Sequence, residues 1–159
     1  MDESDFLLAP DGRQSPMARA IQRGTLRHLL ARGLVGLTEL PLASGRRADI
    51  AALGPRGEVW IVEIKSSVID FRTDRKWPDY RLYCDRLFFA VPLDFPLELL
   101  PQDAGALVAD AFGAAPAWEA PLHPLAGSRR RAMTLRLARA AAGRLMGVSD
   151  PESLRGLDL

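Results

Sequence analysis

The segment that decides the fold covers residues 46–65 and reads RRADIAALGPRGEVWIVEIK. Gly54-Pro55 and Arg56-Gly57, in its middle, are residue pairs typical of tight turns. The residues on both sides are mostly aliphatic, and residues 59–64 have the β-branched and aromatic content of a central strand. The segment therefore predicts two neighbouring strands joined by a short turn.

Three charged side chains stand out in this apolar segment. Asp49 lies on the first predicted strand, and Glu63 and Lys65 lie at the end of the second. Because side chains alternate across a strand, Glu63 and Lys65 share one face. If the two strands pair across the turn, Asp49 reaches the same edge of the sheet. Two carboxylates and one ammonium group would then lie close together.

These groups have the chemistry of a site for a divalent metal. The carboxylates of Asp49 and Glu63, with the backbone carbonyl of Ile64, form a set of hard oxygen ligands suited to Mg²⁺ or Mn²⁺. Such an ion polarises a phosphoryl oxygen and lowers the pKa of bound water, and Lys65 would orient that water or hold the phosphate. The residues also leave a simpler alternative open, in which Glu63 and Lys65 form an ion pair and Asp49 is a turn residue.

The use of lysine supports the first of these interpretations. Of the 21 basic residues, only Lys65 and Lys76 are lysines, and the others are arginines. An ammonium group is compact and its pKa shifts readily, whereas a guanidinium group stays protonated. A lysine at position 65 therefore favours a chemical role.

Longer strings around these residues resemble a known family. Asp49 followed by Glu63-x-Lys65 resembles the signature of the PD-(D/E)XK nuclease superfamily. The strings GRRAD at 45–49, VEIKSS at 62–67, DFRTDRKW at 70–77 and YRLYCD at 80–85 resemble the MmcB family of bacterial DNA-repair proteins. The resemblance implies a restriction-endonuclease-like fold. It also implies a Mg²⁺- or Mn²⁺-dependent DNA endonuclease that acts in repair, with Asp49, Glu63 and Lys65 as catalytic residues.

The sequence departs from the superfamily pattern in its acidic residues. The superfamily often has a glutamate on the first helix, but residues 12–38 contain no acid. Glu39, on the strand expected before Asp49, takes that place as a further metal ligand if the hairpin register puts it on the same face. The missing glutamate favours a second hypothesis, in which the chain is a non-catalytic DNA-binding or adaptor domain with a nuclease-like fold.

Hydrophobic periodicity and turn residues predict the remaining elements. Helices are expected at 16–32, 77–85 and 128–147, further strands at 34–42, 87–91 and 106–109, and loops at 66–74 and 113–127. This order gives an α/β domain at residues 16–147, with a restriction-endonuclease-like αβββαβ core, a mixed central sheet flanked by helices, and an extra C-terminal basic helix. Residues 1–15 are expected to form a loose lead-in, and residues 148–159 a weakly structured tail.

Basic side chains near both ends of the chain are candidates for DNA contact. Six of the expected contacts lie on helices: Arg19, Arg23 and Arg27 on the first, and Arg129, Arg130 and Arg131 at the start of the last. The other three lie near the predicted metal site: Arg47 before Asp49, and Lys76 and Tyr80 after the strand that carries Glu63. An ordinary solvated face explains the stripe on the first helix equally well. On the last helix Ser128 is the expected N-cap, Met133, Leu137 and Leu145 belong to the expected apolar stripe, and Arg136 and Arg144 lie outside it.

The composition limits the class of protein. The chain has 159 residues, a formal net charge of +1 and a single cysteine, Cys84, which excludes an internal disulfide and a cysteine-rich zinc site. Its acidic start lacks the basic region of a secretory signal, and no apolar run reaches the roughly 18 residues of a membrane span. We therefore expect a cytoplasmic protein with no membrane contact, whose partners are DNA and other repair proteins. The sequence leaves open whether the protein forms a homodimer.

Overall fold

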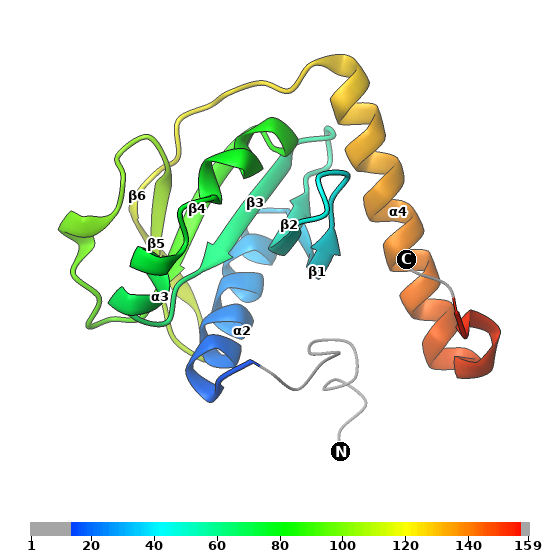
Figure 1. Ribbon diagram of the computed structural model, residues 1–159, viewed down its shortest axis with the longest axis horizontal. Coiled ribbons are helices and arrows are strands. Elements are labelled where there is room, and N and C mark those ends of the chain that lie inside the picture. Colours follow the sequence, from blue (N-terminus) through cyan, green and yellow to red (C-terminus); the bar gives the residue numbers. More distant parts are fainter. Residues whose placement is uncertain (1–13, 157–159) are drawn as a thin grey trace.

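The structure is a computed structural model that describes residues 14–156 and centres on one six-stranded sheet (Figure 1). The strands follow one another across the sheet in chain order: β1 (Val35–Pro41), β2 (Arg47–Leu53), β3 (Val59–Ile64), β4 (Arg86–Val91), β5 (Gly105–Ala109) and β6 (Ala114–Trp118). Strands β1, β2 and β3 are antiparallel neighbours, β3, β4 and β5 are parallel, and β6 is antiparallel to β5. The expected α/β class with a mixed central sheet is confirmed.

Helices flank this sheet on both faces. They are α2 (Pro16–Ala31), α3 (Val68–Thr73) and α4 (Gly127–Ser149), with short 3₁₀ helices η1 (Trp77–Tyr83), η2 (Leu97–Leu99) and η3 (Pro151–Leu154). Helix α2 starts as expected, because the Ser15 hydroxyl accepts a hydrogen bond from the Ala18 N–H and Pro16 occupies the first turn. In Figure 1, α2 lies behind the sheet and α4 runs alongside its β1 end. None of the helices within residues 14–156 is long and apolar enough to cross a lipid bilayer.

Two apolar layers follow from this arrangement, one on each face of the sheet. Under α2, Ile21 packs in the same cluster as Val62 of β3. On the other face, Tyr80 of η1 and Leu137 of α4 share a cluster with Phe89 of β4. All six residues of β3 are buried, as expected for a strand covered on both faces.

The structure differs from the expected elements between β3 and β4. Residues 66–74, expected to form a loop, contain helix α3, whose first turn is capped by the Ser67 hydroxyl accepting from the Asp70 N–H. Helix α3 has only six residues, so it is too short to show a helical repeat in the sequence. The element expected as an α-helix at 77–85 is the 3₁₀ helix η1, which ends at Tyr83.

A strand also lies in the expected loop at 113–127. Strand β6 pairs with β5 at the edge of the sheet, with Pro116 opposite Leu107. Proline lacks the N–H that an inner strand needs, but an edge strand tolerates it. Because β6 is also largely exposed, neither its composition nor its pattern indicates a strand.

Helix α4 differs from the prediction at its start and on its buried face. The helix begins one residue earlier than expected, with Ala126 as an N-cap that makes no side-chain hydrogen bond, so Ser128 does not cap it. Met133 and Leu137 are buried as expected. Leu145, however, is 66% exposed, because the last turns of the helix extend past the sheet.

Two arginines of α4 face the sheet, although the sequence pattern puts them outside the apolar stripe. The Arg144 guanidinium donates to the carbonyls of Thr38 and Glu39 in β1, the second at 2.7 Å. The Arg136 guanidinium donates to the carbonyl of Pro41 at 3.2 Å. These long side chains hydrogen-bond to carbonyls of β1, an edge strand with a neighbouring strand on one side only.

The ends of the chain are described only in part. Most of the expected lead-in at residues 1–15 lies outside the described residues, as do residues 157–159 of the expected tail. Within that tail, η3 contacts the end of α4.

A buried ion pair joins α4 to the centre of the sheet. The Asp85 side chain, just before β4, is only 5% exposed, and its two oxygens accept from the Arg130 guanidinium at 2.6 and 2.7 Å. The same carboxylate accepts from the N–H groups of Val59 and Leu125, both at 2.8 Å. Although burial opposes ionisation, these hydrogen bonds hold the pKa of Asp85 below its usual value.

Asp85→Ala should lower the free energy of unfolding by about 3 kcal/mol, because Arg130 loses its buried partner and two backbone N–H groups lose their acceptor. Chemical denaturation near neutral pH measures this loss. Since the pKa of Asp85 is lowered in the folded state, its contribution is full above the unfolded value of about 3.9. The contribution disappears as the pH falls through the folded value.

The matched control is Asp103→Ala, which removes a carboxylate that is 66% exposed and paired with Arg81. This substitution should cost no more than about 1 kcal/mol. Equal losses in the two variants would contradict the role of Asp85 as the anchor of α4.

Candidate functional site

Asp49 and Glu63 face each other across strands β2 and β3. The pairing of Ile50 with Val62 sets an antiparallel register that, continued by one residue, places Asp49 opposite Glu63. Glu63 Oε1 accepts from the Asp49 N–H at 3.1 Å, and Asp49 Oδ2 accepts from the Ile64 N–H at 2.8 Å. Each carboxylate therefore accepts a hydrogen bond from the backbone of the opposite strand. The turn at 54–57 brings the two strands, and with them the two carboxylates, together.

The surroundings of this carboxylate pair favour protonation. Glu63 is 3% exposed, whereas Asp49 is partly exposed and gives the pair access to solvent. Burial, together with the negative charge of Asp49, raises the pKa of Glu63 well above its usual value. Burial also raises the pKa of Asp49, against the opposing effect of the hydrogen bond from Ile64. Two like charges in this position are stabilised by a proton or a cation.

Lys65 follows β3 and forms its ion pair with Asp74, not with Glu63. Its side chain is 6% exposed, and its Nζ lies 2.6 Å from Asp74 Oδ2. Although burial acts against it, the hydrogen bond from Lys65 holds the pKa of Asp74 below its usual value. The charge of Lys65 also lowers the pKa of Asp49 and of Glu63. The charge of Lys65 therefore acts on the carboxylate pair, although its ammonium group donates its hydrogen bond to Asp74.

Two further acids of the site, Asp70 and Asp74, are not among the site residues that the sequence predicts. Asp70 Oδ2 accepts from the Ser66 N–H at 3.2 Å, and its charge raises the pKa of Asp49. Asp74 holds Lys65 and also accepts from the Lys76 N–H at 3.0 Å. No spacing pattern in the sequence could have found them, because Asp70 lies in helix α3 and Asp74 is the extended residue that ends it, and the sequence does not reveal this six-residue helix.

Glu39 lies across from Asp49 on the neighbouring strand β1, as the ladder pairs on either side of it require. Its φ of 51° is in the left-handed region, which is rare for glutamate. Its carboxylate lies 3.9 Å from the Arg47 guanidinium. Within residues 14–156 no three His, Cys, Asp or Glu side chains are arranged to hold a metal ion. Glu39 therefore does not form such a set with Asp49 and Glu63 in this conformation.

Tyr80 and Lys76, two of the expected DNA contacts, lie in different environments. Tyr80 is 8% exposed, and its hydroxyl donates to the Arg47 carbonyl at 3.0 Å. Burial, with the charges of Glu63 and Asp49, raises the pKa of Tyr80, so the hydroxyl stays a donor. Tyr80 thus fixes the start of β2 close to Asp49, whereas Lys76 is exposed to solvent.

The expected arginine contacts lie on different parts of the molecule. Arg19, Arg23 and Arg27 are exposed on α2, which covers the face of the sheet opposite to Glu63. At the start of α4, Arg129 stacks over the Tyr83 ring at 5.1 Å, Arg130 is engaged by Asp85, and Arg131 is exposed. The Arg47 side chain is 54% exposed, two residues before Asp49. Arg130 is thus engaged within the fold, whereas the other expected arginine contacts are exposed to solvent.

Comparisons with known proteins place the chain in a family. Residues 7–152 match the family model described as DNA repair protein MmcB-like. Among curated proteins, no sequence matches this chain. The solved structure of SPO1766, a protein of unknown function from Silicibacter pomeroyi, has a TM-score of 0.83 and 44% sequence identity, covering 88% of this chain and 95% of that chain. The chain therefore belongs to the MmcB-like family of DNA repair proteins.

Proposed function

We propose that this protein is a divalent-metal-dependent nuclease that hydrolyses phosphodiester bonds of DNA during repair. Membership of a DNA repair family supports the substrate and the context. The observation that carries the proposal is the carboxylate pair, Asp49 and Glu63, held on adjacent strands with raised pKa values. Two carboxylates this close, one of them buried, are stabilised by a bound cation, so the pair fits a cation site.

The oxygen atoms of the pair suit a magnesium or manganese ion. Asp49 and Glu63 each use one carboxylate oxygen to accept a backbone N–H, and their side chains also contact each other, so a bound ion would replace the proton between them. With the Ile64 carbonyl as a third ligand, about half of an octahedral shell stays open for water and phosphate. A bound ion would supply the positive charge that polarises the phosphoryl group and acidifies a water molecule.

Lys65 is the residue that we propose to hold the attacking water and the phosphate. Its ammonium group carries three N–H donors, and Asp74 takes one of them, so two remain for the substrate. In the reaction the water oxygen bonds to phosphorus and the bond from phosphorus to the leaving oxygen breaks. A proton from the water ends on the leaving oxygen, which gives a phosphate monoester and a hydroxyl group. Lys76, Arg47 and the exposed arginines are the proposed contacts to the DNA backbone.

A second candidate function is a non-catalytic DNA-binding or adaptor domain. Two observations favour it. No three acids within residues 14–156 are arranged to hold a metal ion, and the Lys65 ammonium is already paired with Asp74. In that case the carboxylate pair would serve to join β2 and β3, and the exposed arginines would carry the function. Substitutions at Asp49 and Lys65 separate the two candidates.

Asp49→Ala should abolish both Mn²⁺ binding and metal-dependent DNA cleavage, because it removes one of the two carboxylate ligands. Titration calorimetry measures the binding, and incubation with branched, single-stranded and duplex DNA measures the cleavage. The matched control is Glu152→Ala, which removes a carboxylate that is 77% exposed near the end of the chain, and both properties should stay as in the wild type. Wild-type protein that neither binds Mn²⁺ nor cleaves any of these substrates would reject the nuclease.

Mn²⁺ binding should weaken as the pH falls through the raised pKa of Glu63, because protons and the metal compete for the same carboxylates. Without metal, stability should show the opposite trend. Since the folded-state pKa of Glu63 exceeds its unfolded value of about 4.3, the free energy of unfolding should decrease as the pH rises between the two.

Denaturation curves recorded across this pH range, with and without Mn²⁺, measure both effects. Glu63→Gln has no charge to lose, so its stability should depend less on pH and should not respond to Mn²⁺. An identical pH profile for the wild type and Glu63→Gln would contradict the raised pKa and the role of Glu63 as a ligand.

Lys65→Ala should keep Mn²⁺ binding and lose cleavage by a factor of about 10²–10³, the usual effect of removing one group that stabilises a transition state. The fold should tolerate the change, because the Asp74 side chain is 22% exposed and water can solvate it. Survival after DNA damage, in a deletion strain carrying the variant, provides a second measurement. Full survival with Lys65→Ala would favour the adaptor.

A further inference from the structure

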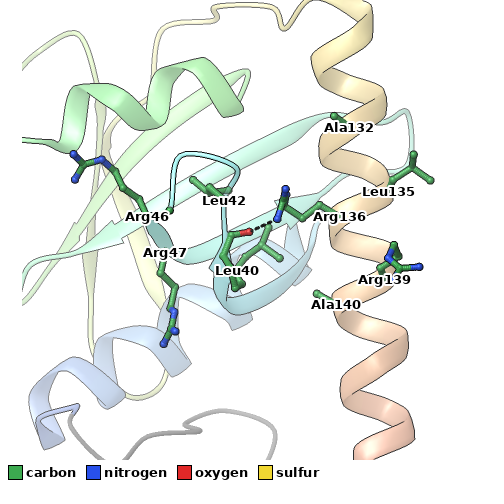
Figure 2. A pocket seen from close by; sticks show the side chains of 11 residues that line it. Leu40, Leu42, Arg46, Arg47, Ala132, Leu135, Arg136, Arg139 and Ala140 are labelled. Carbon is green, nitrogen blue, oxygen red and sulfur yellow. Dashed lines mark hydrogen bonds between the residues drawn. The ribbon is translucent and has the colours of Figure 1, made fainter. Parts of the chain in front are cut away.

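A groove of about 570 Å³ lies between the β1–β2 hairpin and helix α4 (Figure 2). Its volume falls within the range of about 300–1,000 Å³ that is typical of ligand sites. Residues 40–42 and 45–47 form the hairpin wall, and residues between 132 and 140 of α4 form the other. None of the 11 lining residues is acidic, and the basic ones are Arg46, Arg47, Arg136 and Arg139.

Positive charge in this groove exceeds the negative charge around it. The two arginines of the hairpin wall have acidic neighbours, Asp79 at 3.1 Å and Glu39 at 3.9 Å. On the other wall, Arg136 donates to the uncharged carbonyl of Pro41, and Arg139 is exposed. Helix α4 as a whole carries six arginines and no acid. A ligand with several negative charges would offset this excess.

The four arginines line the groove, but their side chains do not converge on one point. In Figure 2, Arg136 extends from α4 toward the hairpin, whereas Arg46 and Arg47 extend in different directions from the hairpin. A single small anion needs donors that converge on it, but successive phosphates of a nucleic-acid strand can each meet a separate guanidinium group. The lining residues include no aromatic ring on which a base could stack. The arrangement therefore suits a sugar–phosphate backbone and not the bases.

The groove adjoins the carboxylate pair through strand β2. Arg47 is the first residue of β2 and precedes Asp49 by two positions. The Tyr80 hydroxyl holds the Arg47 carbonyl in place, and Leu40 of the groove pairs with Ala48. The hairpin wall of the groove therefore ends two residues from Asp49 along β2.

We propose that this groove binds the phosphodiester backbone of one DNA strand beside the cleavage site, with Arg46, Arg47, Arg136 and Arg139 as phosphate contacts. The identity of the ligand rests on the proposed function. Binding in the groove, however, requires neither the metal nor Asp49, so the two proposals can fail separately.

Arg139→Ala tests the groove, because Arg139 is exposed and its removal leaves the buried face of α4 intact. Fluorescence anisotropy of a labelled single strand, in EDTA so that no cleavage occurs, should show binding about tenfold weaker than in the wild type. The slope of log affinity against log salt, between about 50 and 200 mM, should become shallower by about 0.7, because the variant neutralises one phosphate fewer. Arg139→Lys should recover part of the affinity, since it restores the charge.

The matched control is Arg155→Ala, which removes an arginine that is 79% exposed and outside the groove, and its binding should equal that of the wild type. Asp49→Ala should also bind the strand normally even if it cleaves nothing. Unchanged affinity and salt slope in Arg139→Ala and in the Arg47→Ala/Arg139→Ala double variant would overturn the proposal. A polyglutamate peptide that binds more tightly than DNA, and loses affinity in Arg139→Ala, would overturn it as well and assign the groove to an acidic protein segment.

Discussion

The reciprocal hydrogen bonds between Asp49 and Glu63 and each other's strands are the constraint on which the rest of the site depends. The observed ladder of β2 and β3 reaches Ile50 and Val62, and beyond it the two carboxylates take over the backbone N–H groups. Burial of the carboxyl groups in the sheet costs desolvation energy and raises the pKa of both, while the backbone N–H donors act in the opposite direction. Two neighbouring carboxylates in such surroundings are stabilised by a proton or a cation.

The surrounding elements each position one part of this site. Tyr80 from η1 holds the backbone of β2 just before Asp49, and Asp74 after α3 holds the Lys65 ammonium. Arg144 of α4 donates to the carbonyls of Thr38 and Glu39 in β1. The backbone of Glu39 is in the left-handed region. Such a backbone persists only where its surroundings fix it. The helices therefore bury the apolar faces of the sheet and also supply polar side chains that restrain the strands.

Much of the fold and the centre of the site follow from the sequence. Turn residues and side-chain alternation predict the β2–β3 hairpin and the meeting of Asp49 with Glu63, and the family strings point to DNA repair. The short helix α3 and the edge strand β6 escape prediction, because six residues show no helical repeat and an exposed strand needs no apolar pattern. The sequence predicts Tyr80 as a DNA contact, and the structure shows a buried side chain whose hydroxyl donates to a backbone carbonyl.

The sequence by itself determined which groups could do chemistry, since alternation and turn geometry act between residues less than about 20 apart in the chain. Only the tertiary structure decided which partners those groups have. Lys65 meets Asp74 because an unpredicted helix turns the chain back. Arg144 meets Glu39 across a separation of 105 residues, and Arg130 meets Asp85 across 45. A charged side chain of this kind looks identical in sequence whether it faces water or a buried acceptor, because packing between distant segments makes that choice.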